Sequence, residues 1–288
     1  MRILHLLFYS ALLLTACTGN SGPGNDSGRD AGTADAFTRY ASGFRVYERG
    51  SYTLVEVIDP WQQSRDVIFS YVLASDHGIL PDSLRSLPFI KIPVKRVIAL
   101  STTHVAMIDQ LGSASSIVGV SGSDFIYSPG IRQGIESEKV KDVGYGQGLD
   151  FEKIVKLRPD VLFLYGVEGN VMTTLAKLTD LGIPAVFCGE YLDTHPLGKA
   201  EWIRFFSLFF NKQEHSLQFF KAIDSSYSAL SELTSGLKPK PFVLNGLPWK
   251  DTWYMAGGNS FAAQLIKDAG GSYLWSDNPS SQALPLDL

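Results

Sequence analysis

The sequence predicts an α/β fold in which two α/β lobes are joined by a long rigid helix and preceded by a small β extension. Three observations predict it. Between residues 95 and 195, short continuous apolar runs alternate with amphipathic helical patterns, which is typical of a parallel sheet covered on both faces. An uninterrupted helical pattern follows from Gln213 to Leu233. Strand and helix patterns then resume after Lys238.

The composition excludes several classes of protein. The 288 residues are 45% hydrophobic and 19% charged, which is enough apolar material for a packed core. At about 150 residues per domain, this length suggests two domains, or one large domain plus an extension. The formal net charge is −4 and no basic stripe is present, so a nucleic-acid binder is not expected. Two cysteines cannot form a disulfide framework or a cysteine zinc site.

The N-terminus is predicted to be a targeting segment. Arg2 precedes the apolar run Ile3–Leu14, which is typical of a secretory signal, and the run ends in Leu-Thr-Ala-Cys at Cys17. This ending resembles the lipobox of bacterial lipoproteins, in which the cysteine is lipidated. The alternative is an ordinary secretory signal with an incidental Cys17. Residues 18–36, rich in Gly, Ser, Asn and Asp, are expected to form a flexible tether.

Residues 37–94 are predicted to form the β extension. Two runs, Tyr52–Ile58 and Asp66–Leu73, are rich in β-branched and aromatic residues. Arg49–Ser51 is a candidate hairpin turn between Phe44–Tyr47 and the first of these runs.

Residues 95–195 are predicted to form the N-terminal α/β lobe. Its expected strands are Arg96–Leu100, Ile117–Val120, Val161–Leu164 and Ala185–Phe187. Ser101 begins the helix after the first strand as its N-cap, and Gly112 ends that helix. Further helices are expected over Phe151–Leu157 and Met172–Leu181.

Residues 196–237 are predicted to be helical, with one helix over Pro196–Phe210 and the long inter-lobe helix after it. The C-terminal lobe, residues 238–288, contains expected strands at Phe242–Leu244 and Trp253–Met255 and a helix over Phe261–Ala269. This lobe has fewer residues than a domain usually needs to bury a hydrophobic core of its own, so we expect it to be incomplete.

Three segments carry a resemblance to a known family. They are Lys95–Ser101 with Leu111-Gly112 and Ile117–Val120, then Val143-Gly144 with Asp150–Leu162, and last Trp253–Phe261 with Gly270-Gly271. Their order and spacing resemble the substrate-binding proteins of ABC importers for iron–siderophore, haem and cobalamin ligands. The segment Pro196–Trp202 also resembles the versions found in Bacteroides-type bacteria.

The resemblance implies two Rossmann-like lobes that hold a metal chelate in the cleft between them, with no catalysis and no resident cofactor. It implies a monomer that is lipid-anchored through Cys17 in the periplasm and delivers its ligand to an ABC permease and ATPase complex of the inner membrane. It assigns Glu152 to permease docking. The matching acid of the second lobe should lie just past Leu288, so the chain looks truncated in that lobe.

Residues that follow the strands are the candidate ligand contacts, because ligands of such sheets bind at the carboxyl ends of the strands. The candidates are Thr102, Thr103, His104, Asp124, Phe125, Tyr127, Tyr145, Tyr165, Glu168, Glu190 and Tyr191, with Leu247, Trp249 and Trp253 from the second lobe. Their many aromatic rings suit a flat or apolar chelate. No arginine cluster that would hold an anionic siderophore is evident.

Two alternatives stay open at this point. An enzyme could use the same cleft, as a hydrolase or a metal chelatase, but the sequence has no Gly-x-Ser-x-Gly, His-Glu-x-x-His or phosphate-loop motif. Glu168 and Glu190 could pair for glycoside chemistry, although nothing in the sequence orients them. A binder of a free transition metal would need convergence of His104, Glu168 and His195.

Overall fold

The computed structural model describes residues 37–167 and 171–287, all of them within the compact unit Thr33–Leu288. The predicted signal, Cys17 and the 18–36 tether therefore lie outside the described residues, as does Glu168. No helix among the described residues is both long enough and apolar enough to cross a membrane.

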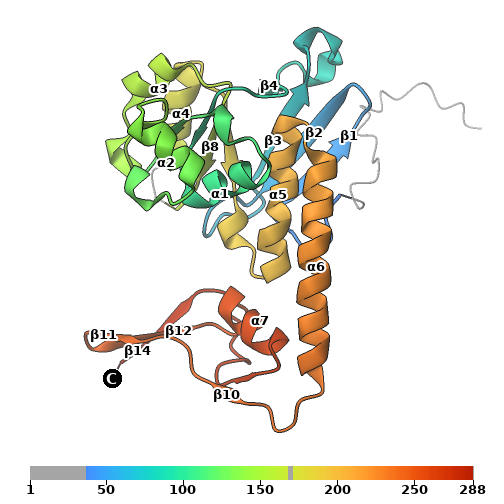
Figure 1. Cartoon of the computed structure of the whole chain (residues 1–288), viewed down its shortest axis with the longest axis vertical. Helices are drawn as coiled ribbons and strands as arrows, with labels where there is room; N and C mark the ends of the chain where they lie inside the picture. The colour runs from blue at the N-terminus through green and yellow to red at the C-terminus, as the bar shows by residue number, and fades with distance from the viewer. Residues whose placement is uncertain (1–36, 168–170, 288) are drawn as a thin grey trace, which may run out of the picture. The chain divides into compact units, whose positions relative to one another are not determined.

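The β extension is a four-stranded sheet of order β1-β2-β3-β4 (Figure 1). Its strands are β1 Phe44–Glu48, β2 Tyr52–Ile58, β3 Ile68–Ala74 and β4 Phe89–Lys91. The predicted hairpin is confirmed, since β1 and β2 pair antiparallel around the turn at Gly50, which has a φ of 66°. The parallel strand β4 was not expected, because its three residues are too few to show a period.

A five-stranded parallel sheet of order β7-β6-β5-β8-β9 forms the centre of the predicted N-terminal lobe. Its strands are β5 Val97–Ala99, β6 Ile117–Val120, β7 Lys141–Asp142, β8 Val161–Tyr165 and β9 Ala185–Cys188. Most of their side chains are fully buried, which explains why the strands read as continuous apolar runs. The two-residue strand β7 was not predicted.

Helices connect these strands and cover the sheet: α1 Thr102–Gln110, α2 Pro129–Glu136, α3 Phe151–Leu157 and α4 Val171–Asp180. The predicted cap is confirmed, because the Ser101 side chain accepts a hydrogen bond from the Thr103 amide. Asp150 caps α3 in the same way at 2.9 Å. Gly112 follows α1 with a φ of 68°, a conformation that favours glycine. Helix α2 was not predicted.

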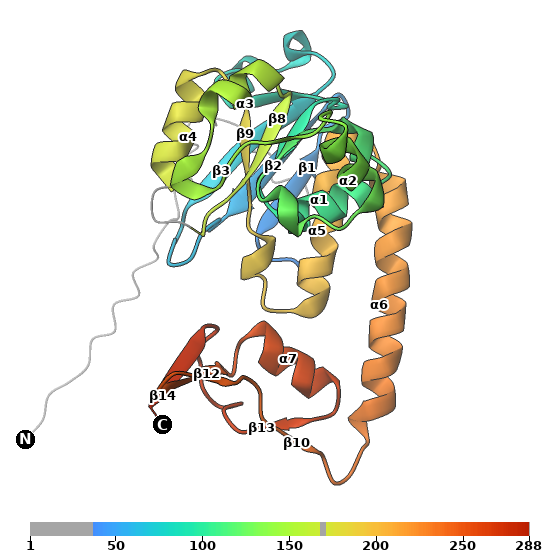
Figure 2. The same cartoon turned by 60° about the vertical axis from the view of Figure 1, so that its left-hand side comes forward.

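Two helices follow, α5 Pro196–Phe210 and α6 Gln213–Ser235. Helix α5 is largely buried, and Trp202, Phe205, Phe206 and Phe209 are inaccessible to solvent. Phe44 of β1 packs on Trp202 with ring centroids 4.8 Å apart, so the β extension shares its core with the parallel sheet. Helix α6 has 23 residues, which at ~1.5 Å per residue is about 35 Å (Figure 2).

The residues after α6 form two small sheets around one helix. The elements are β10 Phe242–Val243, β11 Pro248–Trp249, β12 Thr252–Ala256, α7 Phe261–Asp268, β13 Ser272–Tyr273 and β14 Ala283–Asp287. Strand β10 precedes α7 in the sequence and β13 follows it, and the two strands pair in parallel. Strands β11, β12 and β14 pair antiparallel in a separate sheet.

The expected second parallel sheet is limited to the pair β10–β13, and the other three strands of this region pair antiparallel. The two residues between β11 and β12 form a tight hairpin, with Lys250 at a φ of 55°, and that hairpin makes the pair antiparallel. The unpredicted β14 alternates exposed and half-buried residues, as a one-sided strand does. Strands β5 and β10 lie in different sheets.

Candidate functional site

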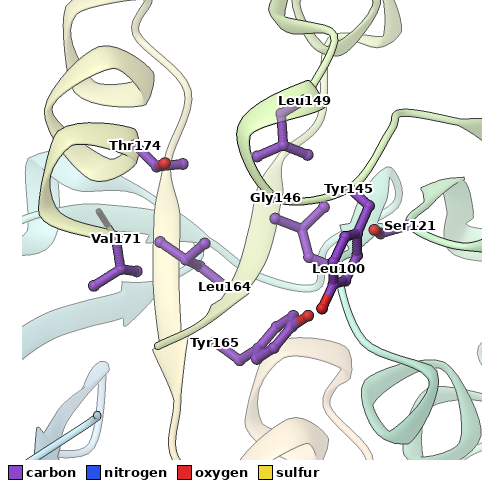
Figure 3. A pocket seen from close by; sticks show the side chains of 9 residues that line it. All are labelled: Leu100, Ser121, Tyr145, Gly146, Leu149, Leu164, Tyr165, Val171 and Thr174. Atoms are coloured by element: carbon purple, nitrogen blue, oxygen red, sulfur yellow. The ribbon is translucent and has the colours of Figure 1, made fainter. Parts of the chain in front are cut away.

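A pocket lies at the carboxyl ends of β5, β6 and β8 (Figure 3). It is a shallow pocket that is open to solvent and has a cavity volume of about 30 Å³. Its lining residues share one property, which is that none carries a charge: Leu100, Ser121, Tyr145, Gly146, Leu149, Leu164, Tyr165, Val171 and Thr174. Sequence order reverses at β5, which has β6 on one side and β8 on the other. Ligands of open α/β sheets bind at this kind of reversal.

The loop that carries Tyr145 is held in place by two side chains that form hydrogen bonds with its backbone. Ser121, directly after β6, donates a hydrogen bond to the Gly144 carbonyl at 2.7 Å. Asp142 accepts from the Gly144 amide at 2.8 Å. Gly144 has a φ of 86°, and a Cβ on it would lie 2.2 Å from the Gly148 carbonyl oxygen. Only glycine fits this turn, which places Tyr145 at the pocket.

The polar side-chain groups of the pocket are the hydroxyls of Tyr145, Tyr165, Ser121 and Thr174. The hydroxyls of Tyr145 and Tyr165 project toward each other, while Leu100, Leu164 and Val171 form apolar walls (Figure 3). Tyr145 is 61% exposed, so its ring is available to a ligand. An uncharged pocket with aromatic rings and hydroxyls can stack a flat ligand and donate hydrogen bonds to it. Among the lining residues that the structure describes, none is a base that could activate a nucleophile.

Three other predicted residues contact one another, the buried His104 and Glu190 and the exposed Thr103. His104 is fully buried in α1, and its Nε2 lies 3.4 Å from Oε1 of the buried Glu190 without a hydrogen bond between them. Thr103 donates to the same carboxylate oxygen at 2.7 Å. Burial raises the pKa of Glu190, but the nearby imidazole of His104 and the Thr103 bond outweigh it, so the pKa is below its ordinary value. None of the three lines the pocket, and His104 and Glu190 lie beneath the surface.

The remaining candidates lie elsewhere. Phe125 and Tyr127 are 69% and 84% exposed and, with Asp124, lie after β6 outside the pocket lining. Thr102 is exposed at the start of α1. Leu247, Trp249 and Trp253 belong to the β11–β12 region. Of the predicted contacts, the pocket therefore brings together Tyr145 and Tyr165.

Sequence reasoning missed most of the pocket lining. Ser121 and Leu100 directly follow strands, so their positions alone could have identified them. Leu149, Val171 and Thr174 come from loops and from the first turns of helix α4, and nothing in the sequence marks them as pocket residues.

The described residues contain no group of three or more metal-ligating side chains. His195 is instead the N-cap of α5: its Nδ1 accepts a hydrogen bond from the Leu197 amide at 3.1 Å. Its ring stacks on Tyr40 at 5.0 Å. Within the described part of the chain, the convergence that a bare-metal site would need is not found.

Two residues remain to be placed: Glu152, which the resemblance assigned to permease docking, and Cys188, the cysteine within the described residues. Glu152 lies in the first turn of α3 with its side chain 88% exposed, and its carboxylate is 3.8 Å from Lys156. An exposed acid in this position is free to meet a partner. Cys188, the other cysteine, is buried, and burial raises the pKa of its thiol well above the ordinary value, as expected for a packing residue.

Comparison with known proteins gives one family match. The model of a family described as periplasmic binding protein matches residues 97–288. An uncharacterized lipoprotein of Methanocaldococcus jannaschii is 30% identical over 65% of this chain and 47% of its own length. The vitamin B12-binding protein of Salmonella paratyphi A is 26% identical over 68% of each chain. The chain spans 47%, 57% and 61% of the length of the first three curated relatives.

A solved structure shares the fold. A possible iron-binding (periplasmic solute-binding) protein of Staphylococcus epidermidis superposes with a TM-score of 0.56 over 68% of this chain and 72% of that one. Its identity is 17%, so the likeness concerns the fold alone.

Proposed function

The chain belongs to the periplasmic binding protein family, and we propose from this membership and the pocket that it captures a metal chelate for an ABC importer. The chelate is an iron–siderophore complex, haem or cobalamin, and the chain delivers it to a membrane permease. Proteins of this family are transport components, so the enzyme alternatives do not apply.

One observation carries the proposal: the uncharged pocket with Tyr145 and Tyr165 at the point where the strand order reverses. Its position is the one that physical reasoning assigns to ligands of parallel sheets. Its aromatic and apolar lining suits the faces of a porphyrin, a corrin or a catecholate complex. The relative that binds vitamin B12 is consistent with this ligand class.

The lobe organisation belongs to the same proposal. We assign residues 95–195 and 238–288 to two lobes that flank the helical segment 196–237. Trp249 and Trp253 of the second lobe then complete the ligand contacts. Trp249 is 69% exposed, which leaves its indole available for such a contact.

The location and partners are proposed on the same basis. The chain is extracytoplasmic and held to a bacterial membrane by a lipid on Cys17, in agreement with the lipoprotein name of its relative. It acts as a monomer. Glu152 docks on the permease, whose ATPase drives release and import.

Ligand titration tests the proposal. Haemin, cyanocobalamin and ferric siderophores of the catecholate, hydroxamate and citrate types are titrated into the purified chain, and tryptophan fluorescence and heat are recorded. At least one of these chelates should bind. Replacing Tyr145 with alanine should weaken that binding by about tenfold, the loss of a contact of ~1.4 kcal/mol.

Tyr127→Ala is the matched control, because Tyr127 is also exposed and in the same lobe but does not line the pocket. Its affinity should stay within about twofold of wild type. Equal losses in both variants would argue against this pocket. Lack of binding by every chelate would refute the proposed function.

A further inference from the structure

The loop between β2 and β3, residues 59–67, contacts the carboxyl end of β8 next to Tyr165, which lines the pocket. It belongs to the β extension, which precedes the region that the family model matches. Trp61 forms a parallel backbone bridge with Gly166, the residue directly after Tyr165. A Cβ on Gly166 would lie 2.5 Å from the Trp61 Cβ and 2.9 Å from the Pro60 carbonyl oxygen. The two backbones are therefore in direct contact at the carboxyl end of β8.

A second contact joins the loop to the end of β9. The Tyr191 hydroxyl donates a hydrogen bond to the Gly166 carbonyl at 3.0 Å. A Cβ on Gly189, directly after β9, would lie 3.7 Å from the Pro60 Cα. Burial raises the pKa of Tyr191 to about 12, so the hydroxyl keeps the proton that it donates. The 59–67 loop is thus tied to the ends of two strands of the parallel sheet.

The loop is held in an unusual conformation. Asp59, Gln63 and Asp66 have φ angles of 45°, 69° and 58°, which residues with side chains seldom adopt. Internal bonds maintain them: Asp59 accepts from the Val67 amide at 3.0 Å. Ser64 donates to the Trp61 carbonyl at 2.6 Å. Strained backbone that its surroundings hold in place is a feature of binding loops.

The side chains of the loop differ from those of the pocket. The Trp61 ring packs inward on Phe69 and Phe187, at 6.0 and 5.6 Å. Gln62, Gln63 and Arg65 are exposed. No hydrogen bond or ion pair of Arg65 with another described residue is found, whereas the pocket lining carries no charge. The loop that contacts the residue after Tyr165 therefore carries an exposed cation whose donors no other described residue uses.

We propose that the 59–67 loop forms one wall of the ligand site and that Arg65 binds a carboxylate of an anionic metal chelate. A guanidinium binds a carboxylate through two parallel hydrogen bonds, a geometry that a hydroxyl-lined pocket cannot supply. The inference rests on the proposed transport function and narrows its ligand class. It favours carboxylate-bearing chelates such as haem or ferric citrate over cobalamin, whose corrin side chains are amides.

The experiment compares Arg65→Ala and Arg65→Glu with wild type in titrations with haemin, ferric citrate and cyanocobalamin. Wild type should bind haemin or ferric citrate, and binding should weaken as salt is raised. Arg65→Ala should lower that affinity about tenfold and lose part of the salt dependence, and Arg65→Glu should lower it further. Arg49→Ala, in the hairpin turn at the opposite end of β2, should stay within about twofold.

Each other outcome has a defined meaning. Unchanged affinity in both Arg65 variants would overturn the inference while leaving the proposed function intact. Binding of cyanocobalamin alone by wild type would overturn the carboxylate assignment in the same way. If wild type binds no chelate of the full panel, the proposed function and this inference both fail.

A second measurement does not depend on the Arg65 side chain. Hydrogen exchange at the backbone amides of residues 59–67 should slow when the bound chelate is added to wild type. Unchanged exchange in this loop, with slower exchange around Tyr145, would show that the loop is not a wall of the site.

Discussion

Replacing Glu201 with glutamine is a severe test of how the β extension is attached. Glu201 is fully buried in α5, and its carboxylate accepts hydrogen bonds from the amides of Arg39, Tyr40 and Ala41 at 2.7 to 3.0 Å. Arg204 lies 3.3 Å away and is itself only 13% exposed. It also donates to the Phe37 carbonyl. One carboxylate thus holds the chain segment that leads into β1.

The size of the effect follows from these contacts. Glutamine has the same shape, so no cavity is left. However, each carboxylate oxygen faces at least one backbone N–H, so the new NH₂ group meets a donor whichever way the amide is turned. An unsatisfied buried donor costs about 1–3 kcal/mol, and breaking a buried ion pair about 3–5 kcal/mol. We expect a loss of about 3–5 kcal/mol in the free energy of unfolding.

Urea denaturation and calorimetry measure this loss. At about 2–4 °C per kcal/mol for a protein of this size, the melting temperature should fall by about 6–20 °C. The control is Glu214→Gln, an exposed position in the first turn of α6, which should change stability by less than about 0.5 kcal/mol. A loss below about 1 kcal/mol for Glu201→Gln would refute the reasoning.

Three further predictions concern the site and its supports. Because the pKa of Glu190 is lowered in the fold, its stabilising effect is present above its ordinary pKa of 4.5 and is lost as pH falls through the lowered value. The stability difference between wild type and Glu190→Gln, measured in urea, should therefore shrink from pH 7 to pH 3, and a constant difference would contradict the assigned shift. Gly144→Ala should cost about 2–3 kcal/mol and weaken ligand binding by displacing Tyr145, since glycine alone fits the turn. The control is Gly130→Ala in α2, where a Cβ meets nothing within 4 Å; it should be neutral or stabilising by about 0.5 kcal/mol. If Gly130→Ala and Gly144→Ala lost similar stability, the claim that only glycine fits at position 144 would be wrong. Glu152→Ala should leave ligand affinity unchanged but reduce several-fold the stimulation of the ATPase of a reconstituted permease. Glu138→Ala, at another exposed acid, is the control and should leave the stimulation unchanged. Full stimulation by Glu152→Ala would show that Glu152 is not part of the interface.

The candidate site was only partly predictable. Tyr145 and Tyr165 were identified because they follow β-strands, and they do line the pocket. Phe125 and Tyr127 satisfied the same rule but lie outside the lining. His104 and Glu190 met it as well, yet both are buried. A position after a strand places a residue at the correct edge of a sheet, but the packing of the following loop decides which side chains reach the pocket.

The sequence by itself determined the elements whose signals are local. The hairpin of β1 and β2, the Ser101 cap and the bounds of α5 follow from turn residues, capping residues and apolar periodicity, which involve near neighbours in the chain. Only the tertiary structure decided the buried contacts of Glu201 with residues 39–41 and the position of the 59–67 loop at β8. These contacts join residues about a hundred or more positions apart. No local pattern encodes such a pairing, because it depends on how complete elements pack against one another.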